Sequence, residues 1–129
     1  MRRRSENTEK NGQVVGYAIA GAERTAVLPF SGELWAMYIL QEYHRQRIGH
    51  LLIEMVANRL ATQQHTSMIV WILADNPCRH FYESLGGTLA GEKTLEIAGK
   101  TLTEVAYVWP DTRSLRNCAA HLRNGLRSS

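Results

Sequence analysis

Residues 44–49 place two arginines and one glycine between a run of apolar residues and an amphipathic segment. Backbone N–H groups in the first turn of a helix have no partner inside the helix, and the positive end of the helix dipole lies there. Arg45 and Arg47 add positive charge, and Gly49 allows a ligand to approach the backbone closely. These residues predict a phosphate or pyrophosphate site. On the loop alone, an ordinary basic helix start is the more frequent explanation, because a loop with one glycine is a weak motif.

The segments on either side of this loop predict a βαβ unit. Residues 34–40 and 67–74 are apolar throughout, as is typical of strands that are covered on both faces. Between them, apolar residues recur at offsets of 0, 3, 4, 7, 8 and 12 from Ile48, which predicts a helix over 48–62. Two strands connected in this way run parallel with a right-handed crossover. We therefore expect the loop at the C-terminal edge of a sheet, where open α/β sheets bind ligands.

Three further elements complete the predicted domain. Residues 13–21 alternate and are rich in strand formers, so they predict a strand. A short helix is expected to begin at Asn76, which can cap it, and to end at Gly86–Gly87. Residues 88–109 predict an antiparallel hairpin that turns at Ala98–Gly99.

Length and charge indicate a globular protein with one core. The chain has 129 residues, of which 44% are hydrophobic and 21% charged, and no apolar run is long enough to cross a membrane. The net charge is +2 over residues 1–10, +3 over 111–129 and −2 over 11–110. A nucleic-acid-binding domain carries its basic residues on a folded face. We therefore expect solvated basic ends and neither a membrane nor a nucleic-acid partner.

This charge distribution suggests three parts along the chain. We expect a basic, polar segment over residues 1–12, a folded core over 13–110 and a basic tail over 111–129 that forms at most one weak helix. Cys78 and Cys118 lie far apart and have no partners at metal-ligand spacing, so we expect no metal. Two such cysteines are consistent with the reducing cytoplasm.

Three stretches, in this order and spacing, resemble the GNAT-type N-acetyltransferase family: GELWAMYILQEYHRQRIGHLL, MIVWILADNPCRHFYESLGG and EIAGKTLTEVAYVW. The resemblance covers about residues 12–110, and its most specific part is Asn76-Pro77 followed by Phe81-Tyr82-Glu83 and Leu85-Gly86.

The basic loop matches the family's acyl-CoA pyrophosphate signature in part. His44 stands where that signature has Gln or Arg, Arg47 replaces its first glycine, and Gly49 keeps the second. A side chain at Arg47 could crowd the pyrophosphate or could pair with a phosphate.

The resemblance implies a mixed α/β fold with a mostly antiparallel sheet, in which the parallel strands 34–40 and 67–74, joined by a helix, splay apart. The pantetheine arm of acetyl-CoA would enter the gap and pair with strand backbone like an added strand. The implied cofactor-binding residues are Met37, Tyr38, Ile39 and Leu40 for the arm, Arg45, Gln46, Arg47, Ile48, Gly49 and His50 for the pyrophosphate, and Asn76 and Phe81 beside the arm.

The implied reaction transfers an acetyl group from acetyl-CoA to an amine of an unidentified small molecule or peptide. Tyr82 matches the tyrosine that gives a proton to the departing thiolate in many members, and Glu33 matches the place of a general-base glutamate. The alternatives are a Tyr82 that packs on the inner face of its helix and a Glu33 that is a solvated carboxylate at a strand end.

One family feature has no counterpart in this sequence. Members usually open with a strand and two helices before the strand equivalent to 13–21, whereas only a dozen polar residues precede it here. Apolar sheet surface would then be uncovered, and we expect a homodimer to cover it. The alternative to an active enzyme is a degenerate module that binds acyl-CoA or dimerises without turnover.

Overall fold

The computed structural model describes residues 3–10, 12–24, 28–44, 47–118 and 127–128. Its elements in chain order are β1 (Arg3–Lys10), β2 (Gln13–Ala22), β3 (Gly32–Ile39), the 3-10 helix η1 (Gln41–Tyr43), α1 (Ile48–Thr62), β4 (Met68–Leu73), α2 (Arg79–Ser84), β5 (Thr88–Ile97), β6 (Lys100–Trp109), the 3-10 helix η2 (Thr112–Leu115) and β7 (Arg127–Ser128).

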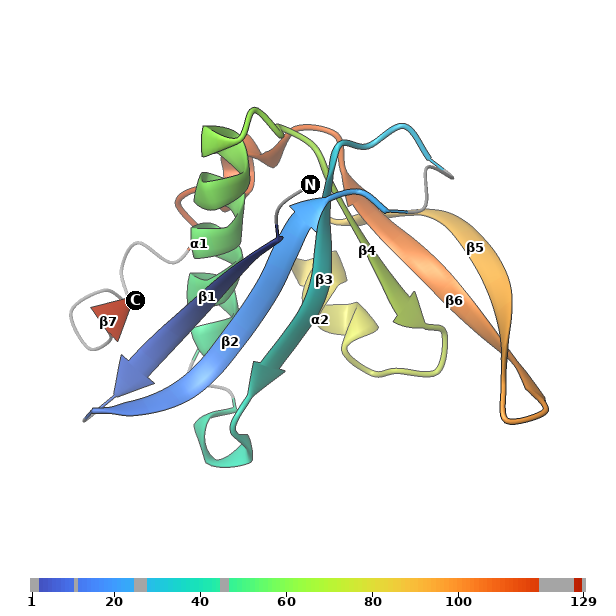
Figure 1. Ribbon diagram of the computed structural model, residues 1–129, viewed down its shortest axis with the longest axis horizontal. Coiled ribbons are helices and arrows are strands. Elements are labelled where there is room, and N and C mark those ends of the chain that lie inside the picture. Colours follow the sequence, from blue (N-terminus) through green and yellow to red (C-terminus); the bar gives the residue numbers. More distant parts are fainter. Residues whose placement is uncertain (1–2, 11, 25–27, 45–46, 119–126, 129) are drawn as a thin grey trace.

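The described strands form one sheet in the order β5-β6-β4-β3-β2-β1-β7 (Figure 1). All neighbouring pairs are antiparallel except β3 and β4, which run parallel and are joined by α1. These two strands pair only from Gly32–Met68 to Leu34–Val70, and beyond this point they diverge. The expected mixed sheet with a splayed parallel pair is therefore confirmed.

Both α-helices pack on one face of the sheet. The buried side of α1, with Leu52, Ile53 and Val56, shares a core with Ala18 of β2. Gly16 allows this close approach, because a Cβ there would lie 3.2 Å from Leu52 Cδ1. In Figure 1 both helices lie behind the sheet.

The opposite face of the sheet is partly open. Tyr17 on β2 and Tyr38 on β3 lie directly opposite each other on this face, with ring centroids 5.9 Å apart and exposed fractions of 41% and 53%. Near β4 and β6, the loop residues Leu28 and Phe30 pack on this face against Ile69. Among the described residues, no helix covers it.

The predicted elements form with small shifts at their ends. The helix over 48–62 has the predicted bounds, and the hairpin turns at Ala98 and Gly99, whose φ values of +53° and +80° are those of a two-residue hairpin turn. The second helix begins at Arg79 rather than at Asn76. Asn76 Oδ1 instead accepts a hydrogen bond from the N–H of Cys78 (2.8 Å) and so starts the turn that leads into α2.

The two ends of the chain differ from the simple basic segments that composition predicted. Residues 3–10 form β1, whose Glu6 is 4% exposed and pairs with Arg59 of α1 at 3.0 Å. β1 has no apolar pattern. Its hydrogen bonds to β2 and the ion pair between Glu6 and Arg59 hold it in the sheet. After Pro110 the chain forms η2, with buried Thr112 and Leu115, and the rest of the expected weak helix, over 119–126, lies outside the described residues.

Candidate functional site

The free edge of β3 provides the first component of the site. Leu40 N–H donates to Val15 O of β2 (2.9 Å). The carbonyl of Ile39 belongs to the same trans peptide unit and therefore points the other way, into the gap beside β4. The backbone N–H and C=O groups of successive residues point to opposite edges of a strand. The backbone groups of Met37 therefore also face the gap, whereas those of Tyr38 face β2.

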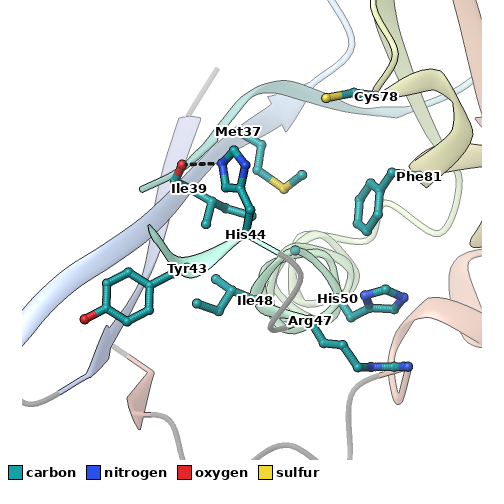
Figure 2. Close-up of a pocket in the computed structure, with 10 residues that line it drawn as sticks. Met37, Ile39, Tyr43, His44, Arg47, Ile48, His50, Cys78 and Phe81 are labelled. Atoms are coloured by element: carbon teal, nitrogen blue, oxygen red, sulfur yellow. Dashed lines mark hydrogen bonds between the residues drawn. The ribbon is translucent and has the colours of Figure 1, made fainter. Parts of the chain in front are cut away.

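A pocket of about 270 Å³ lies where this edge meets the start of α1 (Figure 2). Its walls come from β3, the turn after it, the first turn of α1, and α2 with the turn before it. The lining residues are Met37, Ile39, Tyr43, His44, Arg47, Ile48, Gly49, His50, Cys78 and Phe81. The structure thus brings together most of the residues that sequence reasoning assigned to the cofactor, while Arg45 and Gln46 lie outside the described residues.

Gly49 allows α2 to approach the start of α1. A Cβ at Gly49 would lie 2.9 Å from Phe81 Cζ, so any larger residue must displace that ring. Phe81 also meets the His50 ring edge-on, with centroids 5.3 Å apart. The glycine that was assigned to ligand approach therefore also fixes the wall of the pocket.

Arg47 adopts a conformation that favours glycine. It precedes α1 with φ +61° and ψ +21°, in the left-handed region, where a side chain costs about 1 kcal/mol. Figure 2 shows its side chain running past His50 and away from Met37. Burial raises the pKa of the nearby Cys118 thiol, and the charge of Arg47 partly opposes that shift.

Tyr82 lies behind the pocket wall and does not line it. It is 6% exposed and contacts Phe81 and Trp109 edge-on, at centroid distances of 5.3 and 6.2 Å. Burial raises the pKa of the Tyr82 phenol above its usual range, so the hydroxyl keeps its proton throughout the neutral range. The raised pKa also makes the phenol a weaker acid, and the environment is that of a core residue.

Glu33 lies at the paired end of β3, away from the pocket. Its Oε1 accepts from Arg24 N and Nε at 3.0 and 3.3 Å, and its Oε2 accepts from Arg24 Nη2 at 3.2 Å. Arg24 in turn stacks on Trp35 at 4.4 Å. Both oxygens of a carboxylate that is 2% exposed are thus engaged, which accounts for its burial without a role in proton transfer.

A network that sequence reasoning missed fixes α2 against the sheet. Tyr107 O–H donates to Glu83 Oε2 (2.6 Å), and Arg79 donates to Tyr107 Oη (3.0 Å) and to Ala74 O (2.9 Å). The hydrogen bond from Tyr107 lowers the pKa of Glu83. No pattern in the sequence connects residues 24 or 28 positions apart. The lining residues Tyr43 and Cys78 were also missed.

Two features are absent from the part of the chain that the structure describes. Within the described part of the chain, no three His, Cys, Asp or Glu residues gather as a metal site requires. No helix there is long and apolar enough to cross a membrane.

Comparison with known proteins agrees with this geometry. The profile of the family described as FR47-like protein matches residues 14–96, which is more than half of the chain. The chain belongs to the FR47-like family. Together with the N-acetyltransferase relative described next, this match confirms the resemblance to GNAT-type N-acetyltransferases.

One curated relative of this FR47-like chain is the uncharacterised N-acetyltransferase YuaI of Bacillus subtilis, which is 36% identical over 108 residues. The match includes 84% of this chain, and the chain spans about 62% of the length of YuaI.

Solved structures share the fold of this FR47-like chain. The ribosomal-protein-S18-alanine N-acetyltransferase of Escherichia coli superposes with a TM-score of 0.67 at 20% identity, over 85% of this chain and 70% of that one. The protein yncA of Salmonella typhimurium, solved with its cofactor acetyl-CoA, gives a TM-score of 0.65 at 21% identity, over 79% and 61%.

The first prediction concerns Glu33. Glu33→Gln removes the charge that Arg24 neutralises, so we expect the free energy of unfolding to fall by about 1–2 kcal/mol in urea titrations. Combining it with Arg24→Met should cost less than the sum of the two single changes. Glu96→Gln, at an exposed position of β5, is the control and should change little. Unchanged stability with lost turnover would instead assign Glu33 to the reacting groups.

Proposed function

We propose that this FR47-like chain transfers an acetyl group from acetyl-CoA to an amine. The observation that carries the proposal is the free edge of β3 beside the pocket at the start of α1. Met37 and Ile39 offer backbone groups to an amide-containing arm, as a neighbouring strand would. The positive end of the α1 dipole lies at the pocket, where Ile48 and Gly49 begin the helix, and Arg47 adds positive charge.

The residues present fit such a ligand. An apolar pocket with a few convergent polar groups is typical of small-molecule sites, and Phe81, Ile48 and Ile39 supply its apolar walls. In the sequence-based assignment Asn76 also contacts the arm. Its amide oxygen already accepts from Cys78 N–H, which leaves the amide NH₂ for such a contact.

In the proposed reaction, the amine nitrogen attacks the thioester carbonyl, an N–C bond forms and the C–S bond breaks. The amine loses a proton to water, and the thiolate takes one from the Tyr82 hydroxyl, which solvent then reprotonates. The substrate is an amine of a small molecule or peptide.

The alternative is a module that binds acyl-CoA without turnover. Two observations favour it: Arg47 stands at a position that suits glycine, and Tyr82 lies outside the pocket lining. Both proposals require acyl-CoA binding, and they differ in turnover. For either, we propose a cytoplasmic location, supported by the two free thiols Cys78 and Cys118.

Calorimetry with acetyl-CoA tests the site directly. We expect about one molecule bound per chain, and Gly49→Asp should weaken binding because a carboxylate would face the phosphates. Gly49→Ala is the matched control, since it adds the same Cβ against Phe81 without charge. The aspartate should weaken binding about tenfold more than the alanine. Absence of binding to the wild-type chain at millimolar acetyl-CoA would contradict both proposals.

Tyr82→Phe separates the enzyme from the module. The ring remains, so stability and CoA affinity should hardly change, whereas turnover of acetyl-CoA across a panel of amines should fall by about ten- to a thousand-fold. A wild-type rate in this variant would assign the proton to water. A chain that binds CoA but turns over none of the amines is the module.

We also propose a homodimer that covers the open face of β2 and β3. Tyr17 and Tyr38, together with the exposed Val14 on the same strand as Tyr17, support it as uncovered apolar surface. Sedimentation at tens of micromolar should show a dimer, and Tyr38→Ser should shift it toward monomer. Leu89→Ser, at a similarly exposed position on β5, should not. A compact wild-type monomer argues against this interface.

A further inference from the structure

His44 occupies the last backbone acceptor on the free edge of β3. Its Nε2 lies 2.9 Å from the carbonyl oxygen of Ile39 (Figure 2). Because a carbonyl only accepts, Nε2 carries the proton and donates it. The peptide-unit argument given above directs this carbonyl into the gap, away from β2. The contact is therefore made on the side where an added strand would pair.

The turn after β3 explains how His44 reaches back to this carbonyl. Tyr43 N–H donates to Leu40 O (2.9 Å) and His44 N–H donates to Gln41 O (3.1 Å), so the chain reverses within η1. The His44 ring then lies at the mouth of the gap and lines the pocket together with Met37 and Phe81. On the edge of β3 that faces the gap, no described strand pairs with it there, since its pairing with β4 ends at Leu34.

We propose that His44 is an exchangeable partner for this carbonyl, which it releases to an amide N–H of the ligand. The proposal rests on the proposed acetyl-CoA function. An arm that pairs with the free edge of β3 would approach the Ile39 carbonyl from the gap, where the His44 ring already lies, so the two donors compete for the same space. His44 is exposed, so its ring can turn to solvent without losing hydrogen bonding.

The exchange selects ligands by chemistry. A ligand with an amide N–H beside the Ile39 carbonyl, such as a pantetheine arm, replaces the hydrogen bond that His44 gives up. A plain alkyl thioester has no such donor and would leave the carbonyl unpaired inside the gap, which is unfavourable. His44 is thus a positioning residue that makes binding depend on an amide in the arm.

Calorimetry on His44→Ala and His44→Gln tests this role with two ligands. CoA carries the amide-containing arm, and adenosine 3′,5′-bisphosphate carries phosphates without it. Removing the competing donor should make His44→Ala bind CoA about three- to tenfold tighter, which corresponds to one hydrogen bond of ordinary net strength. Its affinity for the bisphosphate should not change. His44→Gln keeps a donor and should bind both ligands like the wild type.

Nuclear magnetic resonance of the His44 ring gives a second readout. CoA should shift the Nε2 signal of the wild-type chain, and the bisphosphate should not. Weaker CoA binding by His44→Ala, or unchanged CoA binding, overturns the exchange, and equal weakening for both ligands assigns His44 to phosphate binding. Failure of the wild-type chain to bind CoA overturns the proposed function instead, so the two failures are distinguishable.

Discussion

The pairing between β3 and β4 ends at Leu34, and the candidate site depends on this early parting. β4 remains paired with β6 on its other edge along its whole length, from Met68–Trp109 to Leu73–Glu104, so beyond Leu34 and Val70 the edges of β3 and β4 that face each other pair with no described strand. Backbone groups that lose a strand partner must find another, from a side chain, water or a ligand. The Ile39 carbonyl uses His44, and this contact indicates which groups an incoming arm would meet.

The other side of the pocket is held by hydrogen bonds of side chains rather than by pairing between strands. Tyr107 ties Glu83 and Arg79 to β6, and Trp109 Nε1 donates to Leu85 O at 3.1 Å, so both ends of α2 are fixed to one strand. Gly49 then receives the Phe81 ring against α1. The pocket therefore has one firm wall on α2, while its opposite wall is a short turn.

Sequence reasoning reached the fold because apolar periodicity is strong where elements are buried on two sides. The helix over 48–62, the strands beside it and the hairpin turn at Ala98–Gly99 follow from such local signals. β1 carries no such signal, because its inward-facing Glu6 is satisfied by Arg59 from a helix some fifty positions away.

In the candidate site, too, contacts between residues distant in the sequence could not be predicted. The loop and β3 were found from their residues and from the family resemblance, and most of the assigned residues line one pocket. The ion pair of Glu33 with Arg24 and the network around Tyr107 depend on contacts that only the folded chain creates. In the sequence, a carboxylate at the start of a strand looks the same whether it pairs with an arginine or transfers a proton. Spacing alone therefore does not distinguish a structural role from a catalytic one.

The short pairing between β3 and β4, which we call the joint of the sheet, also affects how easily the sheet bends. On one side of this short pairing lie β7, β1, β2 and β3, and on the other lie β4, β6 and β5. Backbone hydrogen bonds connect these two halves over only a few residues of the described sheet. Such a sheet bends about its joint more easily than across any fully paired strand. The width of the gap can therefore change with little loss of backbone hydrogen bonding. The amide hydrogens of Met37 and Ile39, which face the gap, should exchange faster than those of Tyr38 and Leu40, which face β2.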